Sequence, residues 1–341
     1  MPPRCSRPPP LPPKRRTGKS AAGTLDDLLA KRIIFVAGKG GTGKTTVAAA
    51  IALLAARAGK QVLGIAVEPK GDLATALGSK GAGFKPELAQ PNICFLALHP
   101  EESFQEYLHA FFKVPRLARA TPLAKVFDFI ATAVPGPRDM LVVGKVAFEE
   151  RKRDDNGSPT WDLVVVDCSA TGHVLSQLNA ARSLAALVRG GMIRGQVEWI
   201  DGVISDARRT TVVLTALPEE MPVVETLELY ADIVKQRGVH VGGCVLNRMM
   251  RAPLSPASRR LLADLATGDA EIRTKVAGVA SIGADLELGE RLHAAGEAQA
   301  RRLRAEIGVP VVEVPLLATR HGLATSRAVA GAIAEQMAGA S

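Results

Sequence analysis

The sequence predicts an α/β protein whose core is a doubly wound, mostly parallel sheet flanked by helices. Two observations carry this prediction. Short apolar stretches rich in β-branched residues alternate with helical patterns along most of the 341 residues, and this alternation favours parallel strands joined by right-handed crossovers. In addition, a glycine-rich turn separates the first apolar stretch, 33–36, from an alanine-rich helical stretch that begins near Lys44. Such a turn places backbone N–H groups and a helix N-terminus where an anion binds well.

The glycine-rich turn fits a phosphate-binding loop. Gly38, Gly43, Lys44 and Thr45 have the spacing of the motif G-x-x-x-x-G-K-[ST]. Glycines let the backbone wrap a polyphosphate without Cβ clashes. Lys44 is expected to reach the β- and γ-phosphates, and the Thr45 hydroxyl to ligate Mg²⁺. The residues predicted to contact ATP and its Mg²⁺ here are Gly38, Lys39, Gly40, Gly41, Thr42, Gly43, Lys44, Thr45 and Thr46.

The next predicted elements extend the sheet. The helix at 44–58 ends at a glycine, Gly59, which is a common C-terminal signal. A strand is predicted at 61–67, and Glu68 follows it directly, at the edge where open parallel sheets bind ligands. A further strand is predicted at 93–98.

A helical insertion subdomain is predicted from about 100–150 and 185–209. In its first part, apolar residues recur at the spacing of one helix face, and they are Phe104, Tyr107, Leu108, Phe111 and Phe112. A polar surface loop is predicted at 152–160.

An acidic residue, Asp167, ends the predicted central strand at 161–167, which contains three consecutive valines. A carboxylate in this position, after an apolar strand, holds Mg²⁺ directly or through water, so Asp167 is predicted to share the metal with Thr45. The remaining strands are expected at 211–216, 239–246 and 310–314, and the remaining helices at 173–189, 195–208, 221–237 and 323–338. The segment 253–307 is predicted to be polar and rich in helix, with a mobile section around 268–283.

Composition divides the chain into a tail and one domain. Residues 1–25 are predicted to be a disordered tail rich in proline and arginine, and 31–338 a single nucleotide-binding domain. The first 20 residues carry six of the basic side chains, so the net charge of +9 leaves about +3 for the rest. The tail is either simply solvated or makes a weak contact with nucleic acid or anionic lipid. No apolar run approaches 18 residues and no C-x-x-C is present, so we expect a cytoplasmic protein without a membrane span.

The loop KGGTGKT has a second lysine, Lys39, and the segment DCSATGH at 167–173 follows a predicted strand. Together with later segments, in order, they resemble the arsenical-pump and tail-anchored-protein targeting ATPases, which belong to the signature-lysine class. The segment DCSATGH at 167–173 is similar to the family's second switch, D-T-A-P-T-G-H, but departs from it at 168–170. TALPEEMPV, VLNR and VPLL, which begin at 215, 245 and 314, are similar to later family segments. The resemblance spans roughly 31–337.

The resemblance implies site residues beyond the loop. In the class, the extra lysine crosses a dimer interface to the partner's nucleotide. This implies that Lys39 has a catalytic role in addition to that of Lys44. The family's first switch reads D-P-A-H, and here Glu68 stands for its aspartate. The extra methylene moves the carboxylate by about 1 Å, and a misplacement of that size can cost about a hundredfold in rate. Glu68 is therefore either a repositioned water-orienting residue or a sign of slow turnover, with Asp72 as a second candidate. Asn247 and Pro315 match the family's adenine site.

The resemblance also implies partners. It implies a homodimer, or a heterodimer with a paralogous ATPase, and a membrane-protein client or a membrane transporter subunit, whereas nucleic acid is not expected. The alternatives are a catalytically weak, nucleotide-latched subunit and a partition-type switch. A groove for hydrophobic segments would be lined by the face at 104–112 and by Ile193, Val197, Ile200 and Ile204, unless these residues are ordinary core. Cys94, Cys168 and Cys244 either gather into a thiol site or are structural.

Overall fold

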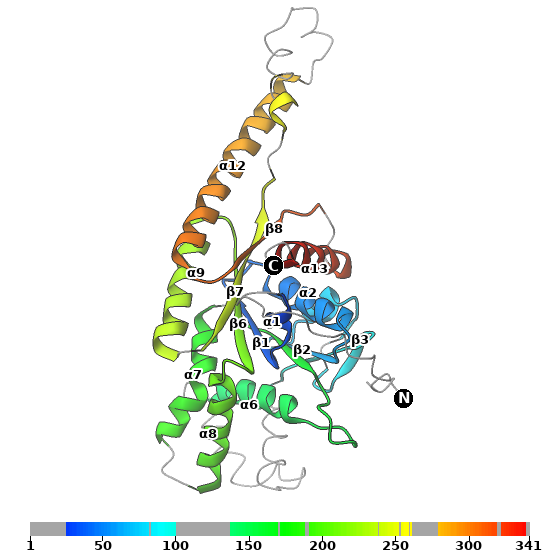
Figure 1. The fold of residues 1–341 in the computed structure, drawn as a ribbon, viewed down its shortest axis with the longest axis vertical. Helices are drawn as coiled ribbons and strands as arrows, with labels where there is room; N and C mark the ends of the chain where they lie inside the picture. Colours follow the sequence, from blue (N-terminus) through cyan, green and yellow to red (C-terminus); the bar gives the residue numbers. More distant parts are fainter. Residues whose placement is uncertain are drawn as a thin grey trace, which may run out of the picture.

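A computed structural model describes residues 25–81, 83–99, 137–169, 171–187, 191–237, 239–251, 254–258, 260, 279–318 and 322–338. In this part of the chain the strands form an eight-stranded sheet of order β3-β4-β2-β5-β1-β6-β7-β8 (Figure 1). All neighbouring pairs are parallel except β3 and β4. The strands are β1 (Ile33–Gly38), β2 (Val62–Ala66), β3 (Glu87–Gln90), β4 (Ile93–Ala97), β5 (Leu163–Asp167), β6 (Thr210–Ala216), β7 (Val241–Met249) and β8 (Val311–Pro315). The predicted fold class is confirmed.

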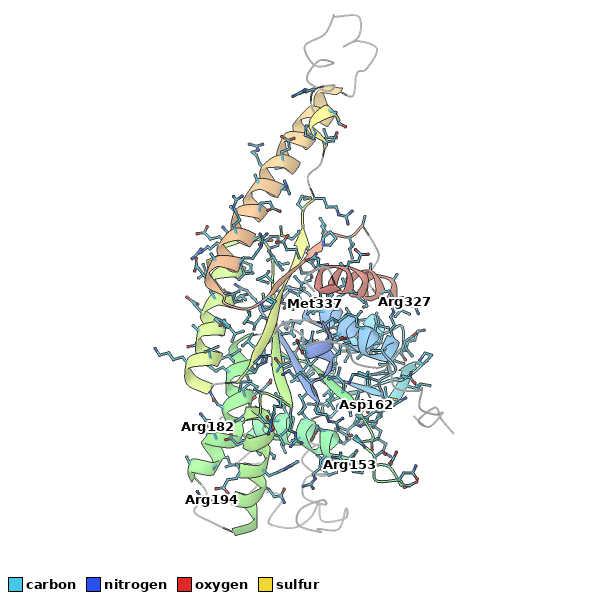
Figure 2. The ribbon with its side chains drawn as sticks, in the orientation of Figure 1. Arg153, Asp162, Arg182, Arg194, Arg327 and Met337 are labelled. Carbon is cyan, nitrogen blue, oxygen red and sulfur yellow. The ribbon has the colours of Figure 1, made fainter. Side chains whose placement is uncertain are left out.

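Helices cover both faces of the sheet. One face carries α1 (Leu25–Leu29), α2 (Lys44–Arg57), α3 (Asp72–Ala76) and α13 (Leu323–Ala338). The other face carries α6 (Pro137–Arg151), α7 (Thr171–Leu187), α8 (Gly191–Ser205), α9 (Glu220–Asp232) with its π-helical end η2 (Ile233–Arg237), and α12 (Val279–Glu306). Arg182 of α7 and Arg194 of α8 are exposed, on the sides of these helices that face away from the sheet (Figure 2).

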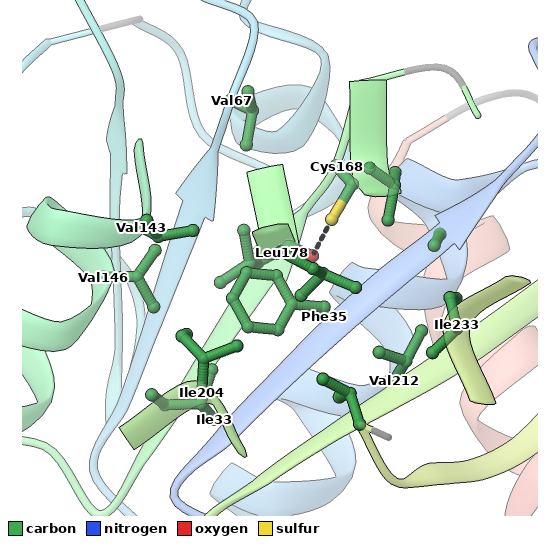
Figure 3. Close-up of a cluster of buried hydrophobic side chains, with 14 of the residues drawn as sticks. Ile33, Phe35, Val67, Val143, Val146, Cys168, Leu178, Ile204, Val212 and Ile233 are labelled. Carbon is green, nitrogen blue, oxygen red and sulfur yellow. Dashed lines mark hydrogen bonds between the residues drawn. The ribbon is translucent and has the colours of Figure 1, made fainter. Parts of the chain in front are cut away.

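Strand β1 shows why the central strands are apolar throughout. Ile33 and Phe35 pack into the core beneath α7 and α8, whereas Ile34 and Val36 pack into the core beneath α2. Each of these side chains is at most 1% exposed. Figure 3 shows Phe35 beside Leu178 of α7, with the Cys168 thiol donating to the Val166 carbonyl at 3.8 Å. A strand buried on both faces needs an unbroken apolar run.

Most predicted elements lie within two or three residues of the observed ones. The prediction missed the short edge strand β3 and the five-residue helices α1 and α3. The aromatic face at 104–112 and most of the segment expected to be mobile lie outside the described residues. The described end of that segment, 279–283, belongs to α12. Within the described residues, no helix combines the length and apolar content needed to cross a bilayer.

Of the two alternatives for the apolar residues of α8, groove or ordinary core, the described residues support core. Val197, Ile200 and Ile204 of α8 are at most 1% exposed and belong to the core beneath the sheet. They pack inward because α8 is amphipathic and must bury its apolar side against a neighbouring element. The residues are therefore core and do not line an open groove.

The three central cysteines are buried and do not gather. Cys94 lies in β4, Cys168 directly follows β5, and Cys244 lies in β7, with exposures of 2%, 4% and 1%. The sheet order places β2 between β4 and β5, and β1 and β6 between β5 and β7. The structural reading of these cysteines is therefore the one that the fold supports.

Candidate active site

The candidate site is built at the carboxyl ends of adjacent strands. Glu68 follows β2, Asp167 ends β5, the loop that begins at Gly38 follows β1, Thr215 lies near the end of β6, and Asn247 lies near the end of β7. These strands are neighbours in the sheet, in the order β2-β5-β1-β6-β7. Because the strands are parallel, their carboxyl ends meet along one edge, which is where doubly wound sheets bind ligands.

Hydrogen bonds of the Thr42 and Thr215 hydroxyls hold the loop against the ends of β1 and β6. The buried Thr42 hydroxyl lies 2.8 Å from the Thr215 hydroxyl and 2.9 Å from the Lys39 carbonyl, to which it donates. The Thr215 hydroxyl also bonds the Ala37 carbonyl at 3.2 Å. The Thr42 N–H also donates to the Lys39 carbonyl, at 3.4 Å. These bonds fix the shape of the loop, so an anion would bind to the other backbone N–H groups.

Two glycines of the loop are required by their surroundings. A Cβ at Gly38 would lie 2.3 Å from the Thr215 carbonyl oxygen, and a Cβ at Gly43 would lie 2.3 Å from Nδ2 of Asn247. Gly43 also has a φ of 92°, in the left-handed region that favours glycine. The predicted glycine positions are thus explained by close packing against β6 and β7.

Lys44 stands at the first turn of α2. Its ammonium donates to the Lys39 carbonyl at 3.0 Å. Burial lowers the pKa of Lys44, and the nearby charge of Asp167 opposes that effect. A partly desolvated ammonium beside a helix N-terminus is well placed to attract phosphate oxygens.

Thr45 and Asp167 form the predicted metal-binding pair. The Thr45 hydroxyl donates to Oδ2 of Asp167 at 2.7 Å. The other carboxylate oxygen, Oδ1, is buried and has no hydrogen-bond partner among the described residues. Desolvation raises the pKa of Asp167 to about 6. An orphaned carboxylate oxygen beside a threonine hydroxyl fits Mg²⁺, a hard cation that takes few protein ligands and completes its shell with water and phosphate.

Glu68 is engaged within its own loop. Its carboxylate forms an ion pair with Lys70, and the side chain is 42% exposed. The hydrogen bond from Lys70 is the main cause that lowers the pKa of Glu68, with Lys44 and His173 contributing through charge. Asp72, the second candidate, is exposed at the start of α3. Glu68 is thus ionised and near the loop, but in this conformation it bonds a neighbouring lysine.

A cavity of about 320 Å³ separates the two predicted switch segments. Glu68, Lys70 and His173 line it together with the buried side chains of Ser169 and Gln177. Gln177 donates to the Ser169 hydroxyl at 3.2 Å, while its Oε1 is buried without a partner among the described residues. The cavity thus lies between the segments after β2 and β5 and the first turns of α6 and α7.

Lys39 has a partner that the sequence did not predict. Its ammonium pairs with the carboxylate of Glu225 on α9. The two residues are 186 positions apart, and Glu225 carries no motif that would have marked it. Lys39 is therefore in contact with its own subunit in this conformation.

Asn247 and Pro315 lie on neighbouring strands of the same edge. Asn247 donates through Nδ2 to the Thr42 carbonyl at 2.9 Å, and its Oδ1 accepts from the Arg248 N–H at 2.9 Å. Pro315 ends β8, opposite Met249 of β7. The contacts of Asn247 in this structure are with the loop, and its contact with adenine stays a prediction.

Fold and site together define a class of protein. A phosphate-binding loop between β1 and α2, with an acidic residue at the end of the neighbouring strand β5, is the arrangement of a P-loop nucleotide-binding protein. The family model for anion-transporting ATPases matches residues 31–197. The chain belongs to this family of ArsA-like ATPases.

Relatives differ in how much of the chain they match. The ATPase BagA of Mycobacterium tuberculosis is 30% identical over 336 residues, which cover 94% of this chain and 97% of that protein. The ATPase get3 of Schizosaccharomyces japonicus is 32% identical over 161 residues, which cover 46% of this chain and 47% of that protein. The arsenical pump-driving ATPase of Escherichia coli is 27% identical over 245 residues, which cover 69% of this chain and 39% of that protein.

Proposed function

We propose that this chain hydrolyses ATP as a dimer and uses the reaction to drive a conformational switch. The observation that carries the proposal is the Thr45–Asp167 hydrogen bond, which leaves a buried carboxylate oxygen directed at no protein group that the structure describes, next to the phosphate-binding loop. A metal-binding pair in this position has an evident use in binding a nucleotide polyphosphate.

Each residue of the site then has a role. The backbone N–H groups of the loop and the Lys44 ammonium bind the phosphates, while Thr45 and Asp167 would hold Mg²⁺. When bound, Mg²⁺ supplies neutralisation of the charge on the β- and γ-phosphate oxygens. Glu68 leaves Lys70 and orients the attacking water. Lys39 of a second subunit stabilises the charge that develops on the transferred phosphoryl group.

Two features support a switch. The segments 68–73 and 167–173 both border the cavity beside the loop. The second segment runs into α7, and α7 packs against both α6 and α8. A change in the contacts of these segments after hydrolysis therefore has a short route to the helices of that face.

The proposed partner of the switch is a membrane-protein client or a membrane transporter subunit, as the sequence resemblance implies. The burial of Val197, Ile200 and Ile204 gives no support to a client groove along α8. The second candidate function is a slow, nucleotide-latched subunit that needs a paralogous partner. The ion pair of Glu68 with Lys70 favours that candidate, because it has to break before the carboxylate can orient a water.

Steady-state ATP hydrolysis tests the proposal. Wild type, Lys39→Ala and Glu68→Ala are measured over a range of protein concentrations. We expect specific activity to rise with concentration for wild type, and to fall at least tenfold in each variant. Bound ATP without measurable turnover in wild type would contradict the proposal and favour the latch subunit.

A further inference from the structure

We propose that Glu225 is a positioning residue that keeps Lys39 inside its own subunit until a second, nucleotide-loaded subunit docks. The inference rests on the proposed function, in which Lys39 acts on the nucleotide of a partner. It adds a residue outside the loop that sets how readily the dimer closes.

The first support is the ion pair itself. Lys39 is bonded to Glu225 through its side chain, and both side chains are partly exposed, at 43% and 27%. The backbone of Lys39 is held separately, because its carbonyl accepts hydrogen bonds from Thr42 at 2.9 Å and from Lys44 at 3.0 Å. The lysine side chain is thus the movable part, and the loop beneath it stays in place.

The second support is the packing of the helix that carries Glu225. Its neighbours Val223 and Thr226 are buried, and α9 packs against β6 and α12. Glu225 therefore presents its carboxylate to the loop from a fixed helix. A lysine bonded to this carboxylate is not free to reach across an interface.

The size of the effect follows from the exposure of the pair. Partly exposed ion pairs shift an equilibrium by about two- to fivefold. A symmetric dimer has to break two such pairs when it closes, so the effect on association is about 4- to 25-fold. Salt screens exposed charges, so the restraint on Lys39 weakens as ionic strength rises.

Two measurements test the inference with one matched pair of variants. Glu225→Gln removes the charge, and Glu228→Gln removes a charge from an exposed residue of the same helix. The first measurement is the labelling rate of Lys39 by an amine-directed reagent in dilute, nucleotide-free protein, followed by peptide mass spectrometry. We expect the labelling rate to rise two- to fivefold for Glu225→Gln and to stay unchanged for Glu228→Gln.

The second measurement is the protein concentration at half-maximal ATP turnover. We expect this concentration to fall 4- to 25-fold for Glu225→Gln and to stay unchanged for Glu228→Gln.

The outcomes separate this inference from the proposed function. An unchanged labelling rate in Glu225→Gln overturns the restraint on Lys39, whatever the ATPase does. A faster labelling rate with an unchanged or higher half-maximal concentration overturns the link to dimer closure. Wild-type turnover in Lys39→Ala, by contrast, contradicts the proposed function and leaves the Glu225 contact as measured.

Discussion

At the residue scale, the burial of the Asp167 carboxylate links ligand binding at the site to the stability of the fold. Asp167 lies in the carboxyl edge of the sheet with one oxygen bonded by Thr45 and the other without a protein partner among the described residues. A buried, half-satisfied carboxylate destabilises the folded protein unless a cation compensates it. The site is therefore built for a bound ligand at the expense of the stability of the nucleotide-free protein.

The variant Asp167→Asn should make the nucleotide-free protein more stable. The pKa of Asp167 is raised from 3.8 to about 6, so the unfolded chain loses its proton at a lower pH than the folded chain. The folded carboxylate is thus disfavoured above about pH 6, by about 3 kcal/mol. We expect the free energy of urea unfolding to rise by up to that amount at about pH 7.5, and by roughly half as much near pH 5. Asp155→Asn, in an exposed loop, is the control, and a loss of stability in Asp167→Asn at neutral pH would contradict the account.

The variant Gly43→Ala should damage the loop through its contact with β7. The added Cβ would lie 2.3 Å from Nδ2 of Asn247, at a backbone φ of 92°. We expect nucleotide affinity to fall at least tenfold and stability to fall by about 1 to 3 kcal/mol, measured with a fluorescent ATP analogue and by urea unfolding. Gly202→Ala in α8, where a Cβ meets nothing within 4 Å, should be harmless. Equal affinities in the two variants would show that Asn247 does not brace the loop.

At the scale of elements, α6 is fixed to the sheet by two buried carboxylates at its C-terminal end. Glu150 accepts from Arg32 at 3.2 Å and from Arg209 at 2.5 Å, which join α6 to the starts of β1 and β6. Glu149 accepts from Nε1 of Trp161 at 3.2 Å, just before β5, and it also pairs with Lys145 and Lys152 of its own stretch of chain. This end of α6 is therefore an anchor, while the other end borders the cavity between the switch segments.

The variant Glu150→Gln should loosen that anchor. Removing one partner of a buried ion pair leaves the other charge uncompensated, which costs about 3 to 5 kcal/mol when both are buried. Arg32 and Arg209 are 23% and 36% exposed, so water compensates part of the loss and we expect a decrease of about 2 kcal/mol in unfolding free energy. Glu198→Gln, from the half-exposed Arg194–Glu198 pair, should change it by less than about 0.5 kcal/mol. Similar small losses in both variants would refute the anchoring role.

The elements also show what the sequence can and cannot predict. The central strands and the phosphate-binding loop were predictable because each depends on local patterns, an unbroken apolar run or a fixed glycine spacing. Edge strand β3 was missed because ELAQ at 87–90 is largely exposed and has no apolar run. Glu225 was missed because its link to Lys39 comes from the packing of α9 against the sheet, which no local pattern records. The burial of Ile200 on α8 is another such case, since a helix face alone does not say whether it covers a sheet or a client.

At the scale of the whole molecule, the residues that we propose for ATP hydrolysis lie along one edge of the sheet. The loop, Asp167, Glu68 and Lys39 come from segments that end or follow the adjacent strands β1, β2 and β5. Lys39, however, bonds Glu225 of its own subunit. The central claim is therefore that a complete site needs a second copy, whose Lys39 replaces the one that is held back.

A mixing experiment with two inactive variants tests that claim most directly. A Lys39→Ala subunit keeps Thr45 and Asp167 but cannot supply Lys39 to its partner. An Asp167→Asn subunit can supply Lys39 to its partner, but its own metal site is defective. If Lys39 acts across the interface, half of the dimers in an equal mixture are mixed, and one of the two sites in each is complete. The account predicts about one quarter of wild-type ATP turnover in the mixture. Turnover no higher than the average of the separate variants would contradict it, because Lys39 would then act within its own subunit or not at all.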